Sequence, residues 1–385
     1  MRIVLLFALI ATCLCEGKEY IVVLKPGAEL SHKFGPENSV VVKRDFDFGP
    51  KYRGYIVELG SNSINSDHLL RSAEVLKVET SKSFSLPVVI GKGVVKRDVN
   101  LHERSKQFNA TYNLDMLDGV VDQTYNYEGD GEGVDAYILD TGILVEHADF
   151  EGRARWGADF SPGGRKVDDL GHGTHIAGTI GSKTYGVAKK CNLIAVRIGG
   201  ATGQPTTAII ISALDFILKS HKSSGRPSIV NMSFGFPYPE MEEPMKILTE
   251  NGVALVAAAG NTDDDACRTF PAKFPFVLTV AANDEHFKLA SFSDFGECVE
   301  IIAPGVDIKS TSNRGPKEYE TMSGTSMSCP HVVGVLAQAY QRNKFKSVDE
   351  AYKFVIEKAK KGAITDKQGR LEPKGKTPNA LIQAV

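Results

Sequence analysis

The residues best suited to chemistry are an aspartate, a histidine and a serine that occur in this order along the chain. Asp140 ends the apolar run AYILD, His172 stands near the start of GHGTHIAGTIG, and Ser326 lies in SGTSMSCPHVVG, shortly before Pro330. A serine hydroxyl is a weak nucleophile at neutral pH, so an imidazole must accept its proton and a carboxylate must hold that imidazole in the right tautomer. These residue types predict nucleophilic acyl transfer, provided that the fold brings the three side chains together.

The sequence around these residues resembles the subtilisin-like serine proteases and, among them, the proteinase K-like branch. Three blocks carry the resemblance in the family's order and spacing, and two shorter segments support it. The blocks are ILDTGI (138–143), GHGTHIAGTIG (171–181) and SGTSMSCPHVVG (323–334), and the segments are NMSFG (231–235) and VAAAGN (256–261). The resemblance implies a subtilisin-like fold and peptide-bond hydrolysis through an acyl-enzyme.

The resemblance also implies a role for each residue that matches the family's motifs. Asp140 matches the orienting aspartate, His172 the general base and Ser326 the nucleophile. Asn261 matches the side-chain donor that forms the oxyanion hole together with the backbone N–H of Ser326. Subtilisin-like enzymes need no catalytic metal for this chemistry.

Two segments match the walls of the family's primary specificity pocket. They contribute Ser233, Phe234 and Gly235 on one side and Ala258, Ala259 and Gly260 on the other. Neither segment contains a carboxylate that could pair with a basic side chain, so we expect broad specificity with an apolar or aromatic preference. The segment VRIGGATGQ (196–204) is shorter than the loop usual in this branch, so the resemblance does not predict the side-chain preferences of the more distant subsites.

Several neighbouring polar residues have structural interpretations. His175 and His331 are close to His172 and Ser326 in sequence, but we expect both to be packing residues inside helices. Of the two N-x-[ST] sequons, the one at Asn109 lies in a polar segment suited to glycosylation. Asn231 ends an apolar run, where we expect the side chain to be buried and unmodified.

The cysteines carry a further expectation. The contexts of Cys267 and Cys298 resemble a disulfide of some proteinase K-like enzymes, which leaves Cys191 and Cys329 as free thiols. Cys329 is three residues from the nucleophile, so it could make the enzyme sensitive to thiol reagents.

The segment FPFVLTVAANDE (274–285) resembles a calcium site of the family. The resemblance implies a structural Ca²⁺ held by the carbonyls of Pro275 and Val277 and by the carboxylate of Asp284. Oxygen ligands of this kind suit a hard cation. The alternative is that Asp284 is a solvated surface acid.

The elements that must position these residues form an alternating pattern from about residue 130 onward. Short apolar runs begin near residues 133, 193, 228, 253 and 276, and amphipathic stretches occupy 206–224 and 240–252. Buried strands that alternate with helices indicate a mainly parallel, doubly wound α/β sheet with helices on both faces. In such sheets the functional residues gather at the carboxyl ends of the strands, where Asp140 stands.

The region before this pattern divides into three parts. Residues 1–15 combine Arg2 with an apolar run and small residues, which is typical of a signal peptide. Residues 16–97 resemble the family's prodomain, a small α+β unit with strands at 20–25 and 54–60 and a helix at 65–75, followed by a link. That link ends at the dibasic pair Lys96-Arg97, a candidate cleavage site, so the peptidase domain is expected to span 98–385.

Composition limits the partners of the protein. The 385 residues are 42% hydrophobic with a formal net charge of -2, which gives no electrostatic reason to bind nucleic acid or an anionic membrane. We expect a monomer that cuts polypeptides and is secreted, or is delivered through the secretory pathway to a lumen or vacuole. Its own prodomain is expected to assist its folding and to inhibit it. The alternatives are a regulatory or binding protein that retains the prodomain, and a protease specific for dibasic sites.

Overall fold

The computed structural model describes residues 18–28, 40–60, 69–70, 72–87, 90–95, 101–103, 105–201, 203–237, 241–366 and 376–385. The chain forms two compact units, Met1–Lys82 and Ser83–Val385. The predicted signal peptide lies outside the described residues. No helix among these residues is long and apolar enough to cross a membrane.

The first unit contains a four-stranded antiparallel sheet in the order β2-β3-β1-β4. Its strands are β1 (Lys18–Leu24), β2 (Val40–Asp47), β3 (Arg53–Leu59) and β4 (Val75–Thr80). Strands β1 and β3 confirm the two predicted strands. The helix predicted at 65–75 is wrong at its end, because Val75 already begins β4; residues 65–68 and 71 of that range lie outside the described part.

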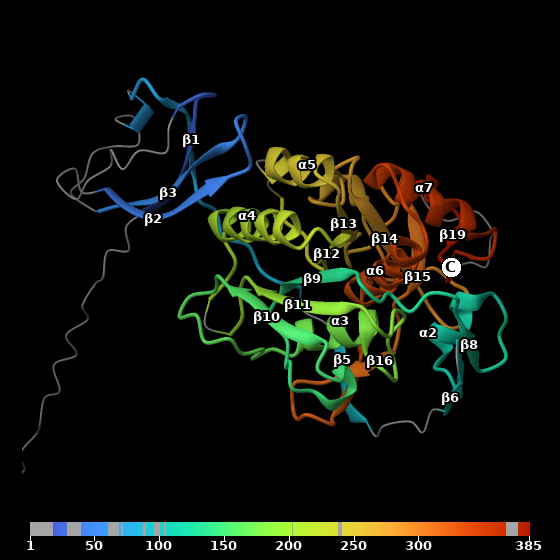
Figure 1. Ribbon diagram of the computed structural model, residues 1–385. Coiled ribbons are helices and arrows are strands. Elements are labelled where there is room, and N and C mark those ends of the chain that lie inside the picture. Colours follow the sequence, from blue (N-terminus) through green and yellow to red (C-terminus); the bar gives the residue numbers. More distant parts are fainter. Residues whose placement is uncertain are drawn as a thin grey trace, which may run out of the picture. The chain divides into compact units, whose positions relative to one another are not determined.

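The second unit is built on a nine-stranded sheet in the order β10-β11-β9-β12-β13-β14-β15-β19-β18 (Figure 1). The strands are β9 (Asp135–Asp140), β10 (Ala154–Asp159), β11 (Asn192–Arg197), β12 (Ser228–Met232), β13 (Val253–Ala258), β14 (Leu278–Asn283), β15 (Ile301–Pro304), β18 (Lys360–Lys361) and β19 (Ala380–Leu381). All neighbours pair in parallel except β18 and β19. The five predicted apolar runs correspond to β9, β11, β12, β13 and β14, which confirms the α/β prediction.

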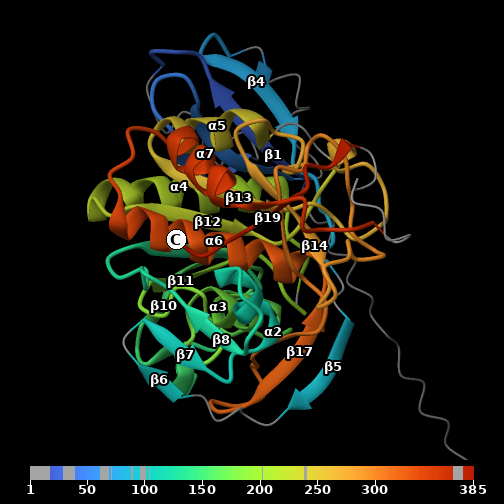
Figure 2. The same cartoon turned by 90° about the vertical axis from the view of Figure 1, so that its right-hand side faces the viewer.

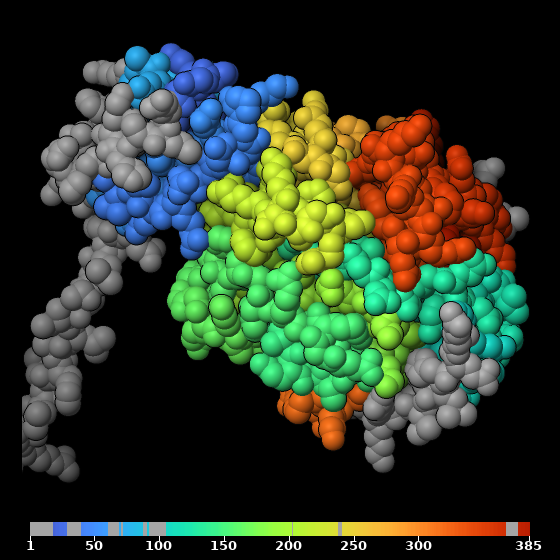
Figure 3. All heavy atoms as spheres, viewed as in Figure 1, coloured from blue at the N-terminus to red at the C-terminus, as the bar shows by residue number. Residues whose placement is uncertain are grey.

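Helices cover both faces of this sheet. They are α2 (Tyr112–Asp115), α3 (His172–Gly181), α4 (Thr207–Ser224), α5 (Glu242–Glu250), α6 (Thr325–Arg342) and α7 (Val348–Lys358), with short 3₁₀ turns η2 (Met116–Asp118), η3 (Ala148–Phe150) and η5 (Ala266–Arg268). Helices α3 and α6 pack together on one face, and α4 and α5 pack together on the other, where Figure 3 shows them side by side at the surface. Burial on both faces explains why β9 and β13 are apolar without alternation.

The position of β9 in the sheet determines where a site can form. The chain runs from β9 toward β11 and β10 on one side and from β12 toward β15 on the other. Such a reversal of strand order opens a crevice at the carboxyl ends of the strands. Asp140, the last residue of β9, therefore lies where a doubly wound sheet places its ligands.

Two small antiparallel sheets complete the second unit. One consists of β6 (Leu101–Glu103), β7 (Lys106–Phe108) and β8 (Thr124–Asn126), and the other of β16 (Ile308–Thr311), β17 (Tyr319–Ser323) and β5 (Ile90–Val95). The sequence predicted a link that ends at Lys96-Arg97, and β5 shows that residues 90–95 of it form a strand. Its backbone forms an antiparallel ladder with β17.

A single tyrosine completes the hydrogen bonding of strand β13. The Tyr352 hydroxyl of α7 donates to the carbonyl of Leu255 and accepts from its N–H, both at 2.7 Å. The ladder between β13 and β14 begins only at the next residue, Val256. Without Tyr352, two buried backbone groups would therefore lose their partner.

Replacing Tyr352 by phenylalanine is expected to lower the free energy of unfolding by about 2 kcal/mol or more, because each buried unsatisfied polar group costs about 1–3 kcal/mol. Denaturant unfolding in a Ser326→Ala background measures this. Tyr340→Phe is the matched control, since the buried Tyr340 hydroxyl has no hydrogen-bond partner in the part of the chain that the structure describes, and its loss should cost little. Equal destabilisation by the two variants would contradict the proposed role of the Tyr352 hydroxyl.

Candidate active site

Asp140 and His172 form the central contact of the site. Asp140 is fully buried, and its Oδ1 lies 2.7 Å from Nδ1 of His172. The same oxygen accepts the backbone N–H of Thr141 at 2.7 Å. A carboxylate on Nδ1 fixes the tautomer in which Nε2 can accept a proton.

His172 is the first residue of α3, and a second carboxylate holds this end of the helix. Asp168 accepts the N–H groups of Gly171 at 2.8 Å and Thr174 at 2.9 Å, and the hydroxyls of Thr141 and Thr174. Free N–H groups at a helix start favour such an acceptor. Sequence analysis missed Asp168, because it lies four residues before the first residue of α3, whereas a capping signal is expected at the N-cap position, which Gly171 occupies.

A glycine allows α3 to approach the turn that follows Asp140. A Cβ placed on Gly173 would lie 2.1 Å from the carbonyl oxygen of Gly142, so no larger residue fits without moving the backbone. This close approach explains why a glycine follows His172 directly in the sequence.

Ser326 is the second residue of α6, and Pro330, four residues later in the same helix, leaves the Ser326 carbonyl without a helical hydrogen bond. Pro330 has no N–H, so the carbonyl of Ser326 lacks its helical donor. The Ser233 hydroxyl donates to that carbonyl at 2.9 Å, and the Ser326 hydroxyl donates to the carbonyl of Ser233 at 3.1 Å. The serine is thereby fastened to the segment that follows β12.

Asn261 follows β13 and is oriented by the first turn of α6. Its Oδ1 accepts the backbone N–H of Thr325 at 2.8 Å and the Thr325 hydroxyl at 3.0 Å. The acceptor end of the amide is therefore occupied, and the NH₂ end remains as a donor. The backbone N–H of Ser326 belongs to the first turn of a helix, whose N–H groups have no helical acceptor.

A cavity of about 270 Å³ contains both Ser326 and Asn261. Five of the six predicted wall residues line it, namely Ser233, Phe234, Gly235, Ala258 and Gly260. Ala259 does not, because its side chain is part of a hydrophobic cluster behind the wall. The structure therefore does not place Ala259 among the residues that line this cavity, and its predicted role stays a prediction.

The same cavity contains a carboxylate that the two predicted wall segments lack. Asp294 is buried, and burial raises its pKa. Its Oδ1 accepts the N–H groups of Thr262 at 2.7 Å and Asp264 at 3.1 Å and the Thr262 hydroxyl at 3.0 Å. Asp294 therefore organises the loop after Asn261.

The three buried histidines near the site differ in their surroundings. Burial lowers the pKa of His172, but the charge and the hydrogen bond of Asp140 outweigh this and raise it overall. Burial lowers the pKa of His175 to about 3 and that of His331 to about 4. Nε2 of His175 bonds the carbonyl of Ile308, and His331 is held through both ring nitrogens, so the packing interpretation of both is confirmed.

The cysteines form the predicted pair. Cys267 and Cys298 form a disulfide, whereas Cys191 and Cys329 are free and buried. Burial raises the pKa of both free thiols to about 12, so neither has thiolate character near neutral pH. The expected sensitivity of Cys329 to thiol reagents is not supported by this environment.

The predicted calcium ligands cannot share one ion. Val277 precedes β14 and Asp284 follows it, and a strand advances about 3.3 Å per residue, which separates them by roughly 20 Å. Asp284 instead closes a turn, since its Oδ1 accepts the N–H groups of His286 and Lys288 at 2.9 Å each. In the described part of the chain, no three acidic, histidine or cysteine side chains form a metal-binding group.

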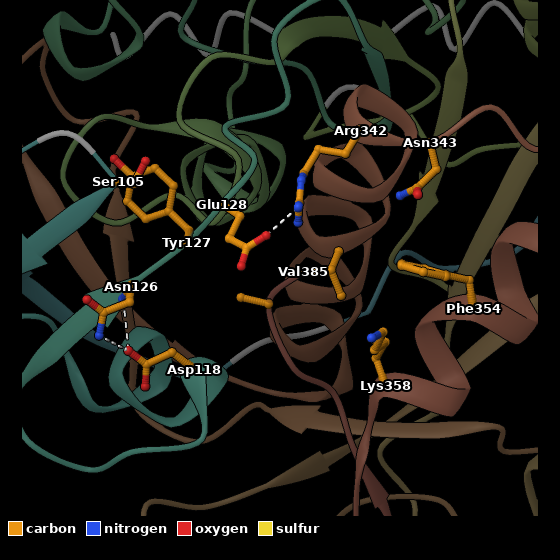
Figure 4. Close-up of a pocket in the computed structure, with 11 residues that line it drawn as sticks. Ser105, Asp118, Asn126, Tyr127, Glu128, Arg342, Asn343, Phe354, Lys358 and Val385 are labelled. Atoms are coloured by element: carbon orange, nitrogen blue, oxygen red, sulfur yellow. Dashed lines mark hydrogen bonds and ion pairs between the residues drawn. The ribbon is translucent and has the colours of Figure 1, made fainter.

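A larger cavity of about 570 Å³ lies elsewhere, between the segment after β8 and helices α6 and α7 (Figure 4). An ion pair joins Glu128 to Arg342 across it, and Asp118 accepts two hydrogen bonds from Asn126. None of the predicted site residues lines this cavity. Its polar groups bind one another, so its size alone gives no reason to assign it chemistry.

The fold and the site define the class of the protein as an α/β serine peptidase. The chain belongs to the subtilase family, whose model matches residues 131–374. It is 35% identical over 336 residues to Alkaline serine exoprotease A of Vibrio alginolyticus, a match that covers 86% of this chain but 59% of that protein. It is also 42% identical over 245 residues to Proteinase T of Parengyodontium album, which covers 63% of this chain and 82% of the relative.

Among solved structures, the crystal structure of a cold adapted subtilisin-like serine proteinase matches with a TM-score of 0.66 and 36% identity. The match covers 72% of this chain and 99% of the other. The similarity therefore extends over the whole of a solved subtilisin-like enzyme.

The imidazole of His172 is expected to titrate with a midpoint above its ordinary value of about 6.5. Asp140→Asn should lower the midpoint, because the effect of burial on the His172 pKa is then opposed only by the smaller effect of the Asp168 charge. NMR of the ring protons in a Ser326→Ala background measures both. His175 and His331 serve as internal controls that should stay neutral between pH 5 and 9, and an unshifted His172 in Asp140→Asn would disprove the coupling.

Proposed function

We propose that the protein is a serine endopeptidase of the proteinase K-like branch that acts through an acyl-enzyme at Ser326. The observation that carries this is the Asp140–His172 pair. Its imidazole lines a cavity of about 480 Å³ that shares Pro87 with the cavity of Ser326 and Asn261. The chemistry requires a base held in one tautomer, a hydroxyl and a donor for a developing oxyanion. Side chains of all three types lie at the carboxyl edge of one sheet.

Proton transfer would begin at Nε2 of His172. This nitrogen is buried and has no hydrogen-bond partner among the described residues, while the Ser326 hydroxyl is bonded to the Ser233 carbonyl. Rotation of the serine side chain exchanges that weak acceptor for the imidazole. The Ser326 oxygen then attacks the substrate carbonyl as His172 takes its proton, and the imidazolium is stabilised by Asp140 and later protonates the leaving amine.

The oxyanion would be held by two donors that are oriented before substrate arrives. These are the amide of Asn261, which Thr325 turns, and the backbone N–H of Ser326. Because they need no rearrangement during the reaction, they stabilise negative charge more effectively than water does. Loss of the corresponding asparagine in subtilisin itself reduces kcat by about 10²–10³.

We infer a broad specificity with an apolar or aromatic preference for the residue before the cleaved bond. The pocket walls supply Phe234, Ala258 and backbone, and the carboxylate Oδ1 of Asp294 is already used by three donors of its own loop. Asp294 is therefore a poor partner for a lysine or arginine, and specificity for dibasic sites is disfavoured. A net charge of -2 likewise offers no strong attraction for basic substrates.

The remaining parts of the proposal concern maturation. We propose a secreted monomer made as a zymogen with a signal peptide at 1–15 and a self-cleaved prodomain. The competing function is a regulatory protein that keeps its prodomain and has no turnover. The presence of every catalytic group favours the enzyme.

The decisive experiment compares Ser326→Ala with the wild type on a mixed peptide library. Ser326→Ala should lose more than about 10⁴-fold in kcat, since the nucleophile is removed, and should remain unprocessed. Ser328→Ala is the matched control, because this buried hydroxyl has no hydrogen-bond partner among the described residues and should be dispensable. Absence of hydrolysis by the wild type after release of the prodomain would favour the regulatory alternative.

We also propose that a structural Ca²⁺ binds at Glu300 rather than at Asp284. Burial raises the pKa of Glu300 to about 8, and its Oε2 accepts the N–H of Thr279 at 2.7 Å. Thr279 lies two residues after Val277, so this carboxylate is near the carbonyls that the sequence indicated. No ion pair neutralises Glu300 among the described residues, and a hard cation would favour its charged form.

A chelator is therefore expected to lower the Tm of the wild type and of Asp284→Asn but not that of Glu300→Gln. Thermal unfolding in a Ser326→Ala background, with and without Ca²⁺, measures the effect, which follows from binding to the native state. An undiminished chelator effect in Glu300→Gln would remove this residue as a ligand.

A further inference from the structure

A buried arginine lies on the strand beside Asp140. Arg197 is the last residue of β11 and lies opposite Asp140 in the parallel ladder of β11 and β9. Its side chain is 0% exposed. A buried charge is costly unless groups of opposite charge and hydrogen-bond acceptors surround it. The partners of Arg197 therefore indicate what this charge holds in place.

The guanidinium of Arg197 contacts three segments. Nη2 donates to Oδ2 of Asp169 at 2.9 Å, and Nε donates to the carbonyl of Gly199 at 3.2 Å. Nη1 lies 3.6 Å from Oδ2 of Asp159, the last residue of β10, which Figure 2 shows beside β11. The planar fork of an arginine can serve partners in several directions at once, whereas a lysine carries a single point charge. One side chain thus joins the end of β10, the segment before α3 and the chain after β11.

The backbone after β11 is in direct contact with this ion pair. Gly199 belongs to the connection between β11 and α4, whose residues 199–201 and 203–206 are called the β11 loop. Oδ1 of Asp169 accepts the N–H of Ala201 at 3.1 Å. A Cβ placed on Gly200 would lie 2.4 Å from Nη2 of Arg197 and 2.4 Å from Oδ1 of Asp169. Any displacement of the pair would therefore displace the β11 loop.

Two adjacent carboxylates connect the β11 loop to the helix that carries His172. Asp168 accepts two N–H groups in the first turn of α3, at 2.8 and 2.9 Å. Asp169 binds Arg197 and the β11 loop instead. The segment that precedes His172 is therefore fixed to the catalytic helix by one carboxylate and to the β11 loop by the next.

The β11 loop borders the cavity of the base. Gly200 and Gln204 line the cavity of about 480 Å³ that His172 also lines. The loop therefore forms part of the surface that a substrate would meet beside the imidazole.

The protein's own chain shows how a polypeptide can lie against this loop. The carbonyl of Pro205 accepts the N–H of Phe84 at 3.1 Å, a backbone contact of the kind that binds extended peptides. Pro87, three residues after Phe84, lines the cavity of Ser326. A chain in this position contacts the β11 loop several residues before it reaches the nucleophile.

We propose that Arg197 is a positioning residue for the reaction, which holds the β11 loop against the segment before His172 and so sets the wall along which a substrate polypeptide lies. This rests on the proposed function of the site. Arg197 is buried and acts through Asp169 and the loop backbone rather than by touching the substrate. Its loss should weaken the binding of substrates that reach the β11 loop and leave the chemistry at the cleaved bond unchanged.

The test uses two substrates with the same residue and leaving group at the cleaved bond, one with a single residue and one with four residues before that bond. The enzyme is produced from the full chain and assayed after release of the prodomain. Arg197→Lys, which keeps the charge but not the fork, should raise KM for the longer substrate about fivefold or more, the equivalent of about one hydrogen bond to the β11 loop. KM for the shorter substrate and kcat for both should change less than about twofold.

Asp169→Ala breaks the same contact from the other side and leaves Arg197 beside Asp159. It should raise the same KM, and the double variant should raise it no further than the larger single effect, because both changes remove one interaction. Arg226→Lys is the matched control. Arg226 forms two bonds with Asp135, the first residue of β9, at the opposite end of the strand from Asp140, so this variant should leave the ratio of the two KM values unchanged.

A KM ratio in Arg197→Lys equal to that of the wild type would overturn the inference, as would a fully additive double variant. If Arg197→Lys does not accumulate as folded protein, the KM ratio of Asp169→Ala decides in the same way. Wild type that hydrolyses both substrates while the ratio stays constant in the variants overturns the inference alone. Wild type that hydrolyses neither substrate overturns the proposed function as well.

Discussion

The hydrogen bond between the carboxylate of Asp140 and the imidazole of His172 is the interaction on which the rest of the site depends. It joins the last residue of a buried strand to the first residue of a helix. The strand must therefore end, and the helix must begin, at these two residues. Gly173 lets the helix come close enough, and Asp168 holds its first turn. An isolated charge at the position of Asp140 would be costly, and the contact with His172 makes its burial possible.

The serine is positioned differently, because one helical hydrogen bond, the one that the Ser326 carbonyl would accept, is not formed. Pro330 leaves the carbonyl of Ser326 without its helical donor, and Ser233 supplies a replacement from the segment after β12. Asn231 donates in turn to the Ser233 hydroxyl at 2.9 Å. The nucleophile and the pocket wall are therefore parts of one hydrogen-bonded network, and a change in the wall would also move the serine. The same bond explains why the sequon at Asn231 is buried and unavailable for glycosylation.

Local sequence patterns predicted the main strands, the helices and the motif residues of the site. They did not predict contacts between segments that are far apart in the sequence. Five strands and two long helices followed from apolar periodicity, and the site residues Asp140, His172, Ser326 and Asn261 could be located from their motifs. Asp294 was missed because its partners Thr262 and Asp264 lie about 30 residues earlier in the sequence. Asp168 was missed because it stands outside the N-cap position of α3, although most of its partners are close to it in sequence. Asp284 was grouped with Pro275 and Val277 because matching a short segment ignored the length of the strand between Val277 and Asp284. Strand β5 was missed because its partner β17 lies more than 200 residues away.

The ladder between β5 and β17 has a consequence for how the protein would choose among polypeptides. Its contacts are made by main-chain groups, which every residue except proline offers alike. Such a ladder detects an extended backbone of several residues rather than a particular side chain. A compact protein can offer such a backbone only by opening part of its structure, and the free energy of that opening differs from region to region. Under the proposed function, selection among folded proteins would then follow their local stability, so that damaged or partly unfolded chains would be degraded before intact ones.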